Sequence, residues 1–132
     1  MRFLSQEWAD RFRETLNARA SYREAAAAWR GEILLLVTRD ATAPAGEGIV
    51  LDLADGSCRS ATYVADAELR ATEFVYEGSR DAWRRLLGGA LDPVKALFGG
   101  TFRIRGNLAK AARFSRAASE LVACVREVPA EI

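Results

Sequence analysis

The sequence predicts an α+β fold in which a five-stranded, largely antiparallel but mixed sheet is covered on one face by helices. Three observations support this prediction. Apolar residues recur at helical spacing near both ends of the 132-residue chain. Five segments of strand character lie between the helical ones, and an Asp-Gly pair joins two of these strands. This length and an apolar fraction of 50% suit one domain that spans residues 1–132.

Two helices are expected at the start of the chain. The first covers residues 6–19, because the segment QEWADRFRETL places an apolar aromatic or leucine side chain at every fourth position. Ser21 and Glu24 have the spacing of a capping box, which favours a second helix. This helix should run through Arg30 and end at Gly31.

Four strands should follow the helices. The run GEILLLVTR is continuously apolar and rich in branched residues, which is typical of a strand buried on both faces. The segments IVLDLADG and SCRSATYV should form a hairpin around the Asp-Gly pair at 55–56. The fourth segment, RATEFVYEG, alternates, so Phe74 and Tyr76 should face one side of the sheet while Glu73 and Val75 face the other.

The next part of the chain predicts two short helices and a strand. Ser79 is placed to begin a helix over 81–87, and Asp92, followed by proline, is placed to begin a second one. In the segment TFRIR, Phe102 and Ile104 should then face one side of a short strand.

Asn107 is expected to cap one long final helix. The apolar stripe of this helix consists of Ala111, Phe114, Ala118, Leu121 and Val125. Three closely linked strands predict an antiparallel meander, and the last strand, which is reached over helices, should make the sheet mixed. The outer face would carry Asp52, Arg59, Glu73, Arg103 and Arg105, with the last two arginines paired to Glu73 or Asp52.

The composition excludes several function classes. With 19 basic and 18 acidic residues, the chain has no charge excess that would favour a nucleic-acid partner. Histidine is absent, which excludes Ser-His-Asp and Cys-His catalysis and most transition-metal sites. The isolated Cys58 and Cys124 are expected to be buried apolar residues, so neither a metal nor a cofactor is predicted. Without a long apolar run or a leader-like N-terminus, a cytoplasmic location is expected.

The second half of the chain resembles the sterol carrier protein type 2 family. The resemblance rests on Asp81 and Trp83 near a helix start, on the glycines of LFGG, and on the segment RIRGN at 103–107. The order of helices and strands also matches over nearly the whole chain. The resemblance implies a stand-alone bacterial-type copy of a five-stranded sheet with helices on one face. It also implies an apolar tunnel that binds sterols, fatty acids, fatty acyl-CoA or phospholipids without chemistry on them.

The resemblance further implies that one set of apolar side chains lines this cavity. The set comprises Phe74, Tyr76, Trp83, Leu87, Leu91, Val94, Leu97, Phe98, Phe102, Ile104, Phe114, Ala118, Leu121 and Val125. The simpler alternative is that these residues are ordinary core. A hollow of more than about 200 Å³ under the last helix would favour the cavity, and side chains that fill this space without such a hollow would count against a lipid carrier. Trp83 either anchors its helix to the sheet or sits at a portal to water.

We expect non-enzymatic binding, with transfer or presentation, of a lipid or acyl-CoA. One alternative is an enzyme or accessory subunit that acts on a lipophilic or acyl-thioester substrate through Asp81, Asp92, Glu73 or Tyr76. Another is a structural module whose apolar groove meets another chain. The expected partners are therefore an apolar small molecule, no nucleic acid, and at most a transient membrane contact. The sequence does not decide whether the chain forms a homodimer.

Overall fold

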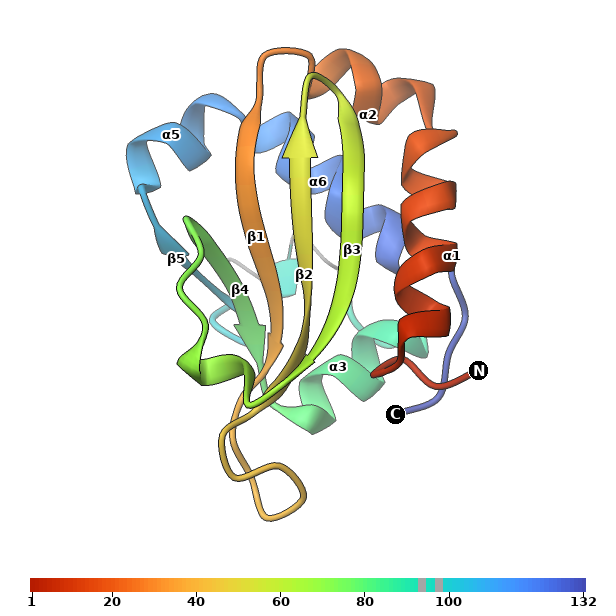
Figure 1. Ribbon diagram of the computed structural model, residues 1–132, viewed down its shortest axis with the longest axis vertical. Coiled ribbons are helices and arrows are strands. Elements are labelled where there is room, and N and C mark those ends of the chain that lie inside the picture. Colours follow the sequence, from red (N-terminus) through yellow and green to blue (C-terminus); the bar gives the residue numbers. More distant parts are fainter. Residues whose placement is uncertain (93–94, 97–98) are drawn as a thin grey trace.

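The computed structural model describes residues 1–92, 95–96 and 99–132 (Figure 1). Its helices are α1 (Gln6–Asn17), α2 (Ala20–Ala25), η1 (Ala67–Leu69), α3 (Arg80–Leu87), α5 (Leu108–Arg113) and α6 (Ser115–Val125). Its strands are β1 (Arg30–Val37), β2 (Glu47–Ala54), β3 (Ser57–Ala65), β4 (Phe74–Gly78) and β5 (Arg103–Gly106). The predicted five-stranded α+β architecture is confirmed.

The five strands form one mixed sheet in the order β3-β2-β1-β4-β5. The first three strands make the expected antiparallel meander, and the turn at Asp55 and Gly56 has positive φ at both residues. The parallel pair is β1 with β4, whereas β5 runs antiparallel to β4. The prediction that the last strand makes the sheet mixed is therefore wrong. The cause is the β3–β4 connection, which carries the chain across the sheet before β4 begins.

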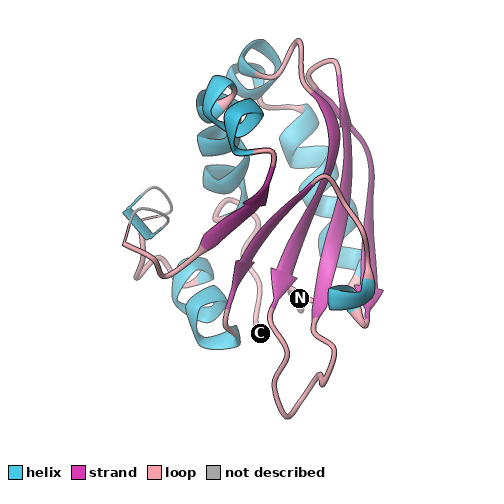
Figure 2. Cartoon of the chain, turned by 90° about the vertical axis from the view of Figure 1, so that its left-hand side faces the viewer, coloured by secondary structure: helices cyan, strands magenta, loops and turns pink. Residues whose placement is uncertain are grey.

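Of the helices named above, all except η1 lie on one face of the sheet (Figure 2). On this inner face Leu35, Val37 and Ile49 belong to the main core. The outer face carries a smaller buried group: Leu34, Leu36, Val50, Val64, Ala67 and Val75. The β3–β4 connection with η1 covers this group, so β1 is buried on both faces, as its continuous apolar run predicts. No helix within the described ranges is long and apolar enough to span a membrane.

Aromatic rings fill the end of the core between α1, α3 and the sheet. Phe3 contacts both Trp8 and Trp83, with ring centroids 4.6 Å and 5.0 Å away. Trp83 is fully buried, and its indole N–H donates a hydrogen bond to the Leu36 carbonyl at 2.8 Å. Trp8 donates in the same way to Val128 at 3.0 Å. Trp83 thus anchors α3 to the sheet, and the portal position does not hold.

The second helix is shorter than predicted. It ends at Ala25, and Arg30 and Gly31 already belong to β1, where they pair with Ala54 and Leu53. Ser21 does not cap the helix; its hydroxyl donates to Glu120 at 2.7 Å, and the N-cap position falls on Arg19. Tertiary contacts override the local signal here, because burial of the indole ring of Trp29 requires the chain to leave the helix before β1.

The final helix is interrupted. Phe114, with φ −109° and ψ 28°, leaves the helical conformation and separates α5 from α6. Its ring packs edge-on against Trp29, with the centroids 5.1 Å apart. This break lets α5 follow β5 while α6 crosses the inner face of the sheet.

The outer face pairs its charges differently from the prediction. Arg103 and Arg105 both pair with Glu77, because Arg103 lies directly opposite Glu77 in the β4–β5 register. Asp52 pairs instead with Arg59 at 3.1 Å. Glu73 pairs with Lys110, outside the sheet.

Substitution of Gly106 by alanine should destabilise the fold strongly. Gly106 lies opposite Phe74 with φ 131°, and an added Cβ would sit 2.3 Å from the Glu73 carbonyl oxygen. We expect the free energy of unfolding in denaturant to fall by at least about 2 kcal/mol. Gly100→Ala is the matched control, because Gly100 also has positive φ but the added Cβ would have no atom of the described residues within 4 Å. Equal losses in the two variants would contradict the close approach of β5 to β4.

Candidate functional site

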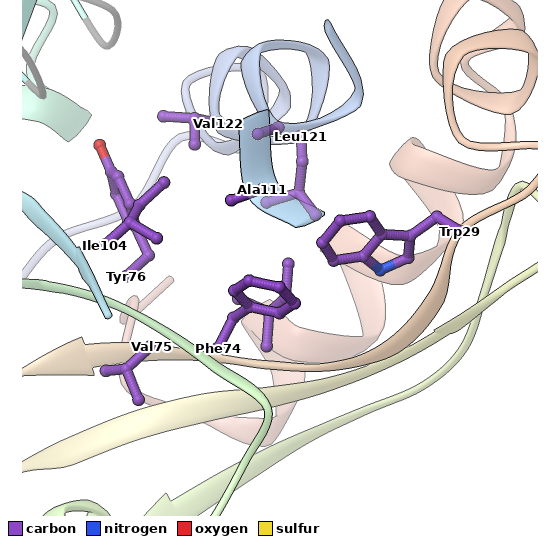
Figure 3. A pocket seen from close by; sticks show the side chains of 10 residues that line it. Trp29, Phe74, Val75, Tyr76, Ile104, Ala111, Leu121 and Val122 are labelled. Carbon is purple, nitrogen blue, oxygen red and sulfur yellow. The ribbon is translucent and has the colours of Figure 1, made fainter. Parts of the chain in front are cut away.

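An apolar pocket lies between the inner face of the sheet and the helices α5 and α6 (Figure 3). Its walls are formed by Trp29, Ile33, Phe74, Val75, Tyr76, Ile104, Ala111, Ala118, Leu121 and Val122. Strands β1, β4 and β5 supply the floor, and the two helices supply the roof. No wall residue is charged, so the pocket is suited to a hydrocarbon group rather than to an ion.

The pocket arises because small helix residues face large sheet residues. The roof includes Ala111 and Ala118, whereas the floor includes Phe74, Tyr76 and Ile104. Protein interiors are normally close-packed, and two alanines in these positions leave space that leucine side chains would fill.

The pocket is narrow. It contains about 390 Å³ of empty space when its open mouth is included, but the centre of a water molecule fits in only about 30 Å³ of it. The enclosed hollow of more than 200 Å³ that the sequence led us to expect is therefore not formed. A long hydrocarbon chain could enter only if the roof and the floor moved apart.

A second pocket adjoins the first. It contains about 200 Å³ including its mouth, and Tyr22, Leu53 and Ala117 lie in its walls. The two pockets share the residues Trp29, Ile33, Ala118 and Leu121. They are therefore two parts of one apolar seam that runs under α6 toward α2.

Two buried polar atoms beside this seam have no hydrogen-bond partner among the described residues. They are the indole Nε1 of Trp29 and the hydroxyl oxygen of Tyr76. Both side chains are more than nine-tenths buried, and burial raises the pKa of Tyr76 above its usual value. In Figure 3, Trp29 and Tyr76 lie on opposite sides of the group of labelled side chains. Unsatisfied buried polar groups are rare in folded proteins, so these two atoms distinguish the seam from the rest of the described core.

One charged side chain lies at the rim. The ammonium of Lys110 sits 5.0 Å from the centroid of the Trp29 ring and 5.9 Å from that of Phe74. It donates hydrogen bonds to a Glu73 carboxylate oxygen and to the Arg30 carbonyl, both at 2.6 Å. The aromatic end of the pocket is thus adjacent to a cation.

The structure brings part of the expected set of lining residues together. Phe74, Tyr76, Ile104, Ala118 and Leu121 lie in the walls of the first pocket. Phe114 contacts Trp29 next to it. The others lie elsewhere: Trp83, Phe102 and Val125 are buried in the core, and Leu87 and Leu91 are half-buried against it. Val94, Leu97 and Phe98 lie outside the described residues.

Five wall residues were missing from the expected set: Trp29, Ile33, Val75, Ala111 and Val122. Strand alternation could have found Ile33, which shares the inner face with Leu35. Ala111 lay on the predicted helical stripe. The sequence carried no signal for Trp29, because it fell inside a segment that predicted a continuous helix.

The carboxylates considered for the enzymatic alternative do not enter the pocket. Asp81 is exposed and pairs with Arg84 at 3.5 Å, and Asp92 is exposed and accepts a hydrogen bond from the Lys95 backbone N–H. Glu73 is exposed at the rim. Within the described ranges no ionisable carboxylate is buried, and no cluster of residues could hold a metal ion. Both cysteine thiols are buried, which raises their pKa values to about 12.

The fold and the pocket together define a class: a helix-covered mixed sheet with a carbon-lined seam beneath its last helices. The chain belongs to the SCP-2 sterol transfer family, whose model matches residues 11–119. This finding confirms the resemblance seen in the sequence. No curated protein sequence matches the chain.

Solved structures agree with this assignment. A crystal structure of sterol carrier protein 2 is 37% identical and superimposes with a TM-score of 0.84, covering 95% of this chain and 98% of that one. A conserved hypothetical protein of Thermus thermophilus is 35% identical with a TM-score of 0.82, covering 99% and 92%. Sterol carrier protein 2 of Yarrowia lipolytica, at 18% identity and a TM-score of 0.55 with 89% and 88% coverage, shares the fold.

Removal of the Tyr76 hydroxyl should stabilise the protein. Tyr76→Phe deletes a buried hydroxyl that has no hydrogen-bond partner among the described residues, so the free energy of unfolding should rise by about 1 kcal/mol. Chemical denaturation measures the change. Tyr63→Phe is the opposite control, since the Tyr63 hydroxyl donates to Glu47 at 2.9 Å and its loss should be destabilising. A destabilised Tyr76→Phe variant would show that the hydroxyl has a partner in solution.

Proposed function

We propose that this protein binds a long apolar ligand, without chemistry on it, in the seam between α5–α6 and the sheet. The observation that carries the proposal is the uncharged, carbon-lined wall of the pocket in a chain of the SCP-2 sterol transfer family. Fatty acids, fatty acyl-CoA, sterols and phospholipids all present such an apolar body. Transfer of the ligand, or its presentation to an enzyme, would follow from reversible binding.

Burial of the hydrocarbon can supply the affinity. Each buried methylene contributes about 0.8 kcal/mol, so a 16-carbon tail gains on the order of 12 kcal/mol gross. Association costs about 4–15 kcal/mol, and the lower part of that range leaves micromolar binding. Few polar contacts are needed for this result, which explains why the sequence shows no dedicated catalytic constellation.

The narrow pocket must widen to admit such a ligand, and the two roof helices differ in how firmly they are held. α5 buries none of its residues, so its displacement exposes little apolar surface. α6 buries five residues, including Leu121 and Val125, and Glu120 binds it to Arg19 at 2.7 Å. We therefore place the opening at α5, while α6 stays on the sheet.

The expected lining residues take their place in this proposal. Phe74, Tyr76, Ile104, Ala118 and Leu121 would contact the ligand directly. Phe114, at the junction of α5 and α6, would move with α5 because it is the residue where the helical conformation is interrupted. Trp83 and Phe102 would support Tyr76 from behind, since both rings pack on it.

The direct experiment is ligand detection. Native mass spectrometry of protein purified from cells should show an adduct of lipid mass, and palmitate should displace a fluorescent fatty acid from the delipidated protein. Absence of both an adduct and displaceable probe binding would overturn the proposal.

A substitution that fills the seam should block uptake. Ala118→Phe places a ring in the wall shared by both pockets, and we expect probe affinity to fall at least tenfold. Over-packing costs about 1–3 kcal/mol, so circular dichroism and thermal unfolding should accompany the titration. Ala112→Phe adds the same bulk at an exposed position of α5 and should bind normally. Unchanged binding by a folded Ala118→Phe variant would place the ligand elsewhere.

A further inference from the structure

The chain concentrates positive charge on the segment that forms one side of the pocket. Residues 99–119 contain Arg103, Arg105, Lys110, Arg113 and Arg116, and no acidic residue. This segment spans β5, α5 and the start of α6. Arg103 and Arg105 lie on the outer face of the sheet and pair with Glu77, so the cations carried by the two roof helices are Lys110, Arg113 and Arg116. An anionic group would be attracted to these helices.

Lys110 is the member of this group that lies against two wall residues of the pocket. Its side chain is 19% exposed, and its ammonium lies against the rings of Trp29 and Phe74, which are both wall residues. The next residue, Ala111, is itself in the wall. The cation is therefore held where an apolar cavity ends, which is the arrangement that suits a ligand with a hydrocarbon tail and a charged head.

The present partner of Lys110 is a carboxylate. The Glu73 side chain is 40% exposed and lies over Gly31, where an added Cβ would be 2.8 Å from the carboxylate oxygen. Gly31 has φ 153°, so the backbone disfavours a side chain at that point. The absence of a side chain there gives the Glu73 carboxylate its place beside the ammonium.

This ion pair is of a kind that can be exchanged. Glu73 is the partner that is open to solvent, with 40% of its side chain exposed against 19% for Lys110, and screening by water limits the net stability that such a pair contributes. A carboxylate carried by a ligand could replace that of Glu73 with an equivalent charge-assisted hydrogen bond, while the tail gains burial in the seam. A neutral head group would gain only a weaker hydrogen bond from the cation, and a cationic one would be repelled.

We infer that Lys110 is the head-group site of the pocket and selects amphiphiles with an anionic head, above all a carboxylate. In this exchange the ligand's anionic group replaces the Glu73 carboxylate as the partner of Lys110. The inference rests on the proposed function and adds the polar end of the ligand to it. Glu73 then acts as an internal competitor that keeps the cation paired when no anionic ligand is bound.

The test compares ligands with one tail and different heads. Dissociation constants are measured for palmitate, 1-hexadecanol and hexadecyl phosphate with the whole chain and its variants. Lys110→Gln should raise the dissociation constant of palmitate at least tenfold and change that of 1-hexadecanol by less than about twofold. Glu73→Gln should increase the affinity for palmitate several-fold. Weakening of hexadecyl phosphate as well would show that a phosphate head uses the same site, whereas weakening of palmitate alone would restrict it to carboxylates.

Two further variants serve as controls. Arg113→Gln removes one positive charge from the same helix at an exposed position and should leave palmitate binding within about twofold. Lys110→Arg keeps the charge and should retain most of the preference for palmitate. Circular dichroism and thermal unfolding confirm that each variant is folded.

The outcomes separate the inference from the proposed function. If Lys110→Gln weakens palmitate and 1-hexadecanol equally, or if Arg113→Gln weakens palmitate as much as Lys110→Gln, the inference is overturned while apolar binding stands. If the unsubstituted protein binds neither palmitate nor 1-hexadecanol, the proposed function fails.

Discussion

The inner face of the sheet is apolar along most of its length, and the rest of the structure depends on how this face is covered. At one end α1 and α3 cover it with large rings, among them Trp8 and Trp83, which fill the space completely. At the other end α5 and α6 present Ala111 and Ala118 to the sheet. Large side chains give a close-packed core, and small ones leave a seam, so one continuous surface carries both a filled region and an open apolar one.

The tryptophans show the same division in their hydrogen bonds. The indoles of Trp8 and Trp83 donate to backbone carbonyls, which fixes each ring in one orientation. The Trp29 indole has no acceptor among the described residues, although its ring is equally buried. A buried donor without a partner carries a desolvation cost that a ligand acceptor or a ring movement could relieve. The Trp29 ring is a wall residue of both pockets, and no hydrogen bond among the described residues fixes its orientation.

The sequence predicted the features that depend on neighbouring residues and missed those that depend on distant ones. The predicted helix starts at Ser79 and Asn107 are confirmed, since each side chain accepts a hydrogen bond from the backbone three residues later. Helix ends were less predictable, because tertiary packing determines the burial of Trp29 and the helix break at Phe114. The same limit applies to the site: alternation identified Phe74 and Tyr76, whereas no local pattern could show that Lys110 meets Glu73.

The Lys110–Glu73 ion pair is better suited to an exchange of partners than the ion pairs of Arg80. Arg80 is 16% exposed and bonds at 2.8 Å to both Asp40 and Glu47, which ties the β1–β2 loop to the start of α3. Hydrogen bonding to Arg80 lowers the pKa of Asp40, so that carboxylate stays ionised well into the acid range. Two carboxylates hold this arginine, and it faces no cavity wall of the seam. Lys110 has one carboxylate partner, at the mouth of an apolar pocket, and a ligand with a tail in the seam brings its own anion to that point.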